Sequence, residues 1–216
     1  MKIKRNFIKW TAAALAACTV FIGGTVAYLT DFDVAANEFT IGNVDIELKE
    51  PHWKPEDNKK LLPTQDVEKD PMITNTGKND AYIYMEVSMP FKNLVTADAN
   101  GFRKAAADTE LFSYTPAADW TLIKEYPKNG KRVRIYAYSR ILKPGETTSA
   151  LFTKMKMANI IEGQIDGETF DIPVRGYAIQ TTNTGGNGSS VTEQAIHAFD
   201  MYLNQNKGRP GAVTEA

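Results

Sequence analysis

The chain offers few side chains for catalysis or metal binding. Its two histidines, His52 and His197, do not form a His-Glu-x-x-His motif, in which two histidines one helical turn apart bind zinc. His52 stands beside Trp53 in a proline-flanked stretch typical of a surface loop, and His197 lies within a predicted helix. We therefore assign no metal ligand and expect neither a metal nor another cofactor.

The nucleophilic side chains are equally isolated. Ser139 and Ser149 lack a Gly-x-Ser-x-Gly motif, and a serine triad would need one of the two histidines. The single cysteine, Cys18, lies in the apolar N-terminal stretch, so a product cleaved downstream of it has no thiol for catalysis or for disulfides. We predict no catalytic residue.

Three carboxylates alternate along one segment and could bind a hard cation. Asp66, Glu68 and Asp70 would share one face of a strand, and calcium prefers such oxygen ligands. The alternative is an ordinary solvated face with Lys60 and Lys69 nearby. We favour the solvated face.

Four tyrosines stand in two predicted strands and could form an aromatic ladder. Tyr82 and Tyr84 alternate in one strand, and Tyr136 and Tyr138 alternate in another. Such a ladder could bind sugar, but aromatic residues on neighbouring strands more often pair with each other. We favour cross-strand pairing.

The first 27 residues have the layout of a secretory signal peptide. A basic start precedes an apolar run over residues 10–22, and small residues lead up to Ala27. We predict a signal helix over residues 1–27 and cleavage between Ala27 and Tyr28, so that the chain contacts a membrane only before cleavage. The basic start consists of Lys2, Lys4, Arg5 and Lys9.

Two other interpretations of the leader stay open. Residues 15–18, Leu-Ala-Ala-Cys, resemble a lipobox, which would make Cys18 a lipidated N-terminus. Residues 10–29 also contain about the 20 apolar residues that span a bilayer, so the leader could remain as an anchor. The apolar continuation after Cys18 argues against the lipoprotein, and the small residues before Tyr28 favour cleavage.

The charge balance argues against nucleic acid as a partner. The full chain carries 25 basic and 26 acidic residues, and the predicted leader contains four of the cations and no acid. The cleaved chain is therefore mildly acidic and has no basic cluster, whereas nucleic-acid binders present basic patches.

Alternating hydrophobicity predicts that residues 28–182 form one all-β domain. Strands are expected at residues 28–37, 44–48, 66–76, 81–89, 120–126, 131–141, 151–157 and 169–180, with Pro90 ending one strand and Asn129-Gly130 forming a hairpin turn. A short helix is expected at residues 98–107. This pattern favours a jelly-roll or immunoglobulin-like antiparallel β-sandwich.

The C-terminal part, residues 183–216, is predicted to contain a flexible linker, a short amphipathic helix and a disordered tail. Residues 190–193, Ser-Val-Thr-Glu, form a capping box. The apolar side chains that follow lie on one helical stripe, so the helix is expected to dock on the sandwich or to cap a sheet edge. Binding to a partner or to a membrane surface is the alternative. The stripe consists of Ala195, Ile196, Phe199, Tyr202 and Leu203.

Several sequence blocks resemble the camelysin and TasA family. The N-terminal blocks are residues 23–31, Gly-Gly-Thr-Val-Ala-Tyr-Leu-Thr-Asp, and residues 37–48, Asn-Glu-Phe-Thr-Ile-Gly-Asn-Val-Asp-Ile-Glu-Leu. Similar blocks follow at residues 70–77, 80–83, 144–148, 151–152 and 178–180, so the resemblance covers most of the chain.

The resemblance implies export through a SipW-type signal peptidase and residence in the extracellular matrix or at the surface of a Gram-positive bacterium. Matrix members of the family form biofilm fibres when the freed N-terminal segment of one subunit completes the sheet of the next, a form of strand addition. Here the partner would be another copy or a related matrix fibre protein. The matching donor segment is residues 28–39, with Tyr28, Leu29, Phe32, Val34 and Phe39 as its assembly residues.

The resemblance also leaves two alternatives. Camelysin itself is described as a surface metalloprotease that cleaves casein, so a metalloendopeptidase is the first alternative function. Since no zinc ligands can be mapped, we expect the chain not to be an enzyme. A minor or anchor subunit of a matrix fibre is the second alternative, and the sequence does not separate it from a fibre-forming subunit.

Overall fold

The computed structural model describes residues 44–54, 61–184 and 187–207. The chain divides into two compact units, Met1–Asp33 and Val34–Ala216, and every described residue belongs to the second. The described residues form antiparallel sheets and one C-terminal helix, which confirms the all-β sandwich prediction. Among these residues, no helix is both long enough and apolar enough to cross a bilayer.

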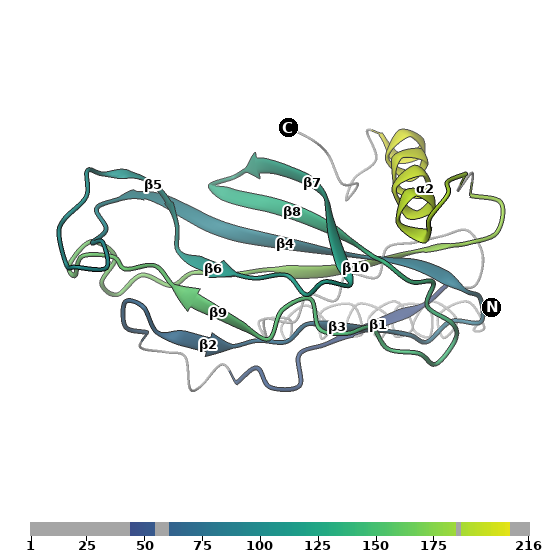
Figure 1. Ribbon diagram of the computed structural model, residues 1–216, viewed down its shortest axis with the longest axis horizontal. Helices are drawn as coiled ribbons and strands as arrows, with labels where there is room; N and C mark the ends of the chain where they lie inside the picture. Colours follow the sequence, from purple (N-terminus) through teal and green to yellow (C-terminus); the bar gives the residue numbers. More distant parts are fainter. Residues whose placement is uncertain (1–43, 55–60, 185–186, 208–216) are drawn as a thin grey trace, which may run out of the picture. The chain divides into compact units, whose positions relative to one another are not determined.

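The strands follow one another along the chain and precede the helix (Figure 1). Their bounds are β1 (Ile46–Lys49), β2 (Asp66–Glu68), β3 (Met72–Asn75), β4 (Ala81–Leu94), β5 (Ala107–Glu110), β6 (Phe112–Tyr114), β7 (Trp120–Lys128), β8 (Lys131–Tyr138), β9 (Lys154–Met157) and β10 (Val174–Gln180), and the helix is α2 (Val191–Asn206).

One layer is a five-stranded sheet in the order β10-β4-β8-β7, with β5 paired to the far end of β4. The predicted end of β4 at Pro90 is wrong, because the strand continues to Leu94. Pro90 lies where β4 changes partner from β8 to β5. The missing amide of a proline costs little at such a junction, and the Pro90 carbonyl still accepts a bond from the Leu111 amide.

The β7–β8 hairpin forms as predicted. Asn129 and Gly130 both have positive φ angles, 50° and 71°, as the two central residues of a type I′ turn require. Arg134 of β8 links β5 and β7, because its guanidinium donates two bonds to Glu110 of β5 and one to Glu125 of β7. The bonds from Arg134 and Arg132 lower the pKa of the Glu125 carboxyl.

The second layer consists of the pair β1-β3 and the three-stranded sheet β2-β9-β6. In Figure 1 these strands lie below the five-stranded sheet. The main apolar core lies between the layers, where the inward side chains of β4 meet those of β3 and β9. Its fully buried members include Ile73, Ile83, Met85, Met89, Leu111, Leu151 and Met155.

The helix expected at residues 98–107 is absent from this described part of the chain. Asp98 Oδ1 accepts bonds from the amides of Asn100 and Phe102, and Gly101 has a φ angle of 83°. These bonds fold the segment into a turn, and β5 begins at Ala107. Local side-chain bonds of Asp thus outweigh the helix propensity of the neighbouring alanines.

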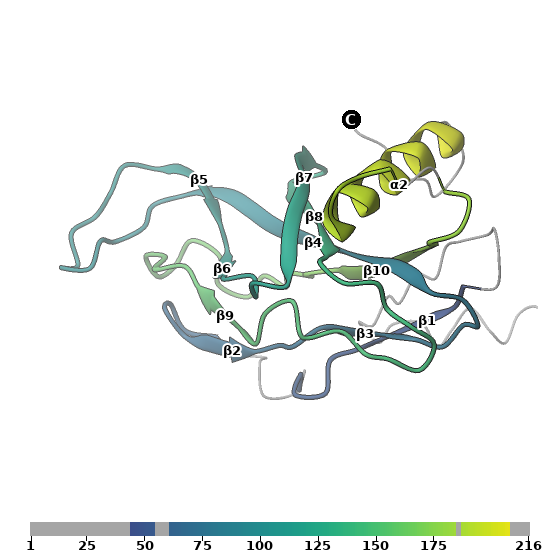
Figure 2. The same cartoon turned by 45° about the vertical axis from the view of Figure 1, so that its right-hand side comes forward.

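Helix α2 confirms the predicted capping and docking. The Ser190 hydroxyl accepts a bond from the Glu193 amide, and the Glu193 carboxylate reaches back to Ser189 rather than to Ser190. Figure 2 shows the helix lying over the face of the five-stranded sheet. Tyr84 connects the two, since its hydroxyl donates to the Ala195 carbonyl at 2.7 Å.

The aromatic ladder of four tyrosines is wrong. The register pairs Tyr84 with Ala137 and Met85 with Tyr136, so the tyrosines of β4 and β8 lie on opposite faces of the sheet. Tyr82 and Tyr84 pack under α2, whereas Tyr136 and Tyr138 belong to the core between the layers. The cross-strand pairing that we favoured is therefore also wrong for this set.

Candidate functional site: an open sheet edge and a charged corner

The residues predicted to carry cleavage and assembly lie outside the described residues. They are Ala27, Tyr28, Leu29, Phe32, Val34 and Phe39, and Cys18 of the lipoprotein alternative also lies there. Cleavage after Ala27 and strand addition by residues 28–39 therefore stay predictions. The described part of the chain begins at Val44, just before β1 and soon after residues 28–39 in the sequence.

β1 pairs with β3 on one side only, among the strands that the structure describes. Amides of Thr76 and Gly77 donate to the Asp45 carbonyl, so the alternation of an antiparallel ladder directs the backbone polar groups of Ile46 and Leu48 toward the other edge. The far edge of β3 is covered, since Asn75 and Thr148 form backbone bonds across it. Among the described strands, β1 is thus an edge strand of its layer.

An edge strand of the other layer, β10, lies opposite this position (Figure 1). A Cβ atom on Gly176 would come within 2.9 Å of Ile73 Cδ1 and 3.2 Å of Ile46 Cδ1. The two layers therefore approach closely here, and the side chains of β1 alternate between buried Ile46 and Leu48 and exposed Glu47 and Lys49. An added strand at this edge would extend an existing apolar interior.

β7 is also an edge strand, but its features discourage pairing with another chain. A bulge interrupts its register between Leu122 and Lys124, and Pro127 stands near its end. Bulges, lysines and prolines are the features by which proteins protect sheet edges. β1 has the exposed charges of Glu47 and Lys49, but it contains neither a proline nor a bulge.

A cluster of charged residues, called the charged corner below, follows β1 directly. It consists of Glu50, His52, Lys69 and Asp70. The Asp70 carboxylate accepts a bond from the His52 amide at 2.9 Å and lies 2.6 Å from His52 Nδ1. Beside it, Lys69 Nζ lies 2.5 Å from Glu50 Oε2 and 4.5 Å from the centre of the Trp53 ring. The side chains of Lys69 and Glu50 are only 5% and 2% exposed, so this pair is buried.

The sequence interpretation missed this corner because it treated residues 66–70 as one alternating strand. β2 ends at Glu68, and both Lys69 and Asp70 are buried. Asp66 and Glu68 are exposed, so the predicted shared carboxylate face is wrong for Asp70. Asp66 accepts a bond from Lys154, which lowers the pKa of its carboxyl. The signal available in the sequence was Pro71, which interrupts the alternation.

The described residues do not fit a catalytic metal or a serine triad. His52 is bonded to Asp70, and His197 is exposed on α2, far along the chain. No group of three or more His, Cys, Asp or Glu side chains in the described ranges could hold a metal ion. Ser149 donates to Asp119 and not to a histidine, and Ser139 bonds Asp119 through its backbone amide.

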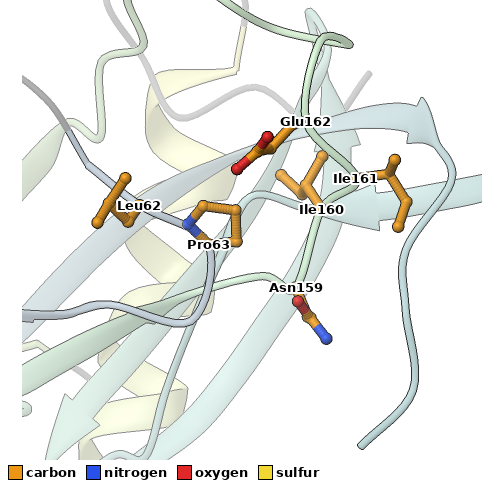
Figure 3. A pocket seen from close by; sticks show the side chains of 6 residues that line it. All are labelled: Leu62, Pro63, Asn159, Ile160, Ile161 and Glu162. Carbon is orange, nitrogen blue, oxygen red and sulfur yellow. The ribbon is translucent and has the colours of Figure 1, made fainter. Parts of the chain in front are cut away.

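An open hollow of about 530 Å³ lies beside the loop that precedes β2. Figure 3 shows its mostly aliphatic lining. The side-chain amide of Asn159 already has partners within the fold, because its nitrogen donates to the carbonyls of Ala97 and Asp98. The hollow therefore contains no pair of groups arranged for acid–base chemistry. It is lined by Leu62, Pro63, Asn159, Ile160, Ile161 and Glu162.

A model of a known family matches the N-terminal part of the chain. Residues 2–105 match the family model described as camelysin metallo-endopeptidase. No curated protein matches the chain. The matched region includes β1, the charged corner and β4, which are the elements described above. The N-terminal part of the chain therefore resembles the camelysin family, in keeping with the resemblance of its sequence blocks.

Proposed function

We propose that the protein is a secreted structural subunit of a biofilm matrix, which joins copies into fibres by N-terminal strand addition. The observation that carries this proposal is the edge of β1, where the backbone groups of Ile46 and Leu48 point away from the only described strand that pairs with it. Strand addition supplies main-chain hydrogen bonds to such an edge.

The proposed donor is residues 28–39 of a neighbouring copy. In its sequence Tyr28, Phe32 and Val34 fall on one strand face and Asp31 and Asp33 on the other, which suits a strand with one buried face. Removal of the leader after Ala27 by a SipW-type signal peptidase would free this segment. The processed protein then resides in the matrix or at the cell surface, in keeping with the generally surface or secreted location of camelysins.

Electron microscopy of two processed chains tests the proposal. The first begins at Tyr28, and the second lacks residues 28–39; a chain that lacks only residues 208–216 controls for the effect of trimming a terminus. We expect fibres from the first chain and from the control, and monomers from the second. Equal fibre formation with and without residues 28–39 would refute strand donation.

Substitutions within the donor segment test the packing of its side chains without removing the segment. In the donor, replacing Phe32 and Val34 by alanine should weaken each junction by about 2–5 kcal/mol, because large apolar side chains lose their burial. The expected result is a higher critical concentration for fibre growth, measured by sedimentation. Thr30→Ala, on the same predicted strand face but without a large apolar group, is the matched control and should change it little.

The family description favours a second candidate function, a surface metalloendopeptidase. Metal analysis of the purified protein and a chelator-sensitive casein assay distinguish it from a structural role. A stoichiometric metal together with chelator-sensitive cleavage would establish the peptidase. Inactive, metal-free protein that still forms fibres would leave the structural function.

The third candidate, a minor or anchor subunit, differs from the first only in its partner. Mixing the processed protein with a related matrix fibre protein tests it. Incorporation into those fibres without growth of fibres by the protein alone would identify a minor subunit. Growth by the protein alone would identify the partner as a second copy.

A further inference from the structure

Two neighbouring ties connect the segment after β1 to the junction between β2 and β3. In the first, the Asp70 carboxylate binds both the backbone amide and the imidazole of His52. In the second, Lys69 and Glu50 form the buried ion pair. Glu50 and His52, which follow β1, thus contact two consecutive residues, Lys69 and Asp70.

The two ties differ in how they respond to protons. The Lys69–Glu50 pair is shielded, since both side chains are almost fully buried. In the first tie the Asp70 side chain is 8% exposed, whereas the His52 side chain is 73% exposed. The carboxylate is therefore held in place while solvent reaches the imidazole, and histidine is the side chain whose charge ordinarily changes near neutral pH.

The charges around His52 favour its protonated form. The hydrogen bond to Asp70 is the main cause that raises the pKa of His52, and the charges of Asp70 and Glu68 act in the same direction. Limited burial and the charge of Lys54 oppose it. Since the partners in the second tie carry opposite charges close together, their net effect at His52 is small.

We propose that His52 and Asp70 form a pH-dependent clamp on the chain where it leaves β1. With the imidazole charged, the clamp combines an ion pair with two hydrogen bonds to one carboxylate. With the imidazole neutral, the ion pair is lost and the segment is held less firmly. The proposal concerns the fold of this corner and stands independently of fibre formation.

The sign of the effect follows from proton linkage. A group that binds its proton more tightly when folded stabilises the folded state below its unfolded pKa, and this contribution disappears as the pH rises through its folded pKa. The clamp is therefore closed in mildly acidic solution and loosens as the pH rises through the raised pKa of His52. The buried Lys69–Glu50 tie keeps the corner folded in both states.

Nuclear magnetic resonance on the processed protein, purified from cells that express the full chain, tests the clamp. The midpoint of the His52 ring titration is measured in the native protein and in two variants, Asp70→Asn and Glu68→Gln. We expect Asp70→Asn to lower the midpoint clearly, and the matched charge removal in Glu68→Gln to lower it only slightly. An unchanged midpoint in Asp70→Asn would overturn the proposal.

Amide exchange gives a second readout that does not depend on the folding of Asp70→Asn. The protection factor of the backbone amide at position 52 is followed across the titration in the native protein and in His52→Gln. The clamp predicts that protection falls with rising pH in the native protein and stays constant in the variant. Constant protection in the native protein would contradict it, and so would an equal fall in both proteins.

Discussion

At the scale of single residues, the buried pair Lys69–Glu50 requires that two charged side chains leave water when the protein folds. A buried carboxylate is tolerated because a cation and hydrogen bonds offset its lost hydration. Lys69 supplies that cation at 2.5 Å, and the ring of Trp53 covers it. The pair therefore fixes the corner after β1 at the cost of desolvating two charges.

Replacing Lys69 by methionine should lower the free energy of unfolding by about 3–5 kcal/mol, because the buried Glu50 carboxylate loses its counter-charge. Urea denaturation measures the change. Lys154→Met, at an exposed pair with Asp66, is the matched control and should cost less than about 1 kcal/mol. If Lys69→Met and Lys154→Met cost the same, the buried pair has no special importance for stability.

Gly176 is a second residue whose position leaves no room for a larger side chain. A methyl group at this position would approach Ile73 Cδ1 to 2.9 Å, which forces the core to shift. We expect Gly176→Ala to destabilise the protein by about 1–3 kcal/mol. In the double variant Gly176→Ala/Ile73→Val the offending methyl is gone, so the two costs should be less than additive in thermal denaturation. Strictly additive costs would show that the contact is not limiting.

At the scale of elements, α2 depends on the sheet beneath it. Phe199 is 1% exposed, and its ring lies 4.8 Å from Tyr84 and 6.5 Å from Tyr177. An amphipathic helix of this length owes most of its stability to such packing and not to its own propensity. The burial of Tyr84 under the helix also raises the pKa of its hydroxyl well above the usual value.

Phe199→Ala should therefore cost about 3–5 kcal/mol of stability, the range found for deleting a buried aromatic side chain. Denaturant unfolding followed by circular dichroism measures it. Met201→Ala, on the exposed side of the same helix, should change stability by less than about 0.5 kcal/mol. A small effect of Phe199→Ala would mean that α2 is not docked on the sheet in solution.

At the scale of the whole molecule, the edge of β1 that pairs with no described strand predicts binding in trans. A chain that lacks residues 28–39 should bind a synthetic peptide with the sequence of residues 28–39 at this edge. At a peptide concentration about 100-fold above the dissociation constant, the peptide should stabilise the chain by about 2.7 kcal/mol. A thermal shift that grows with peptide concentration measures this, and a scrambled peptide is the control. Equal shifts with both peptides would exclude a specific acceptor edge.

The sequence predicted the features that depend on local chemistry. The alternation in Ile46–Lys49 and in the first half of β4, the hairpin at Asn129-Gly130 and the cap at Ser190 each need only neighbouring residues, and each was confirmed. The family blocks, which are also local, indicated the camelysin family, whose model matches residues 2–105. Local geometry and short motifs are encoded within a few positions, so they can be recognised without the fold.

Tertiary structure decided what depends on partners distant in the chain. The register between β4 and β8 separated the four tyrosines, and the pairing of β4 with β5 extended the strand beyond Pro90. Contacts across 18 and 19 positions brought His52 to Asp70 and Glu50 to Lys69. Such contacts depend on how the strands are ordered and registered, which hydrophobic alternation does not specify. Only the folded chain therefore shows which of the described strands lie at a sheet edge and which charges meet.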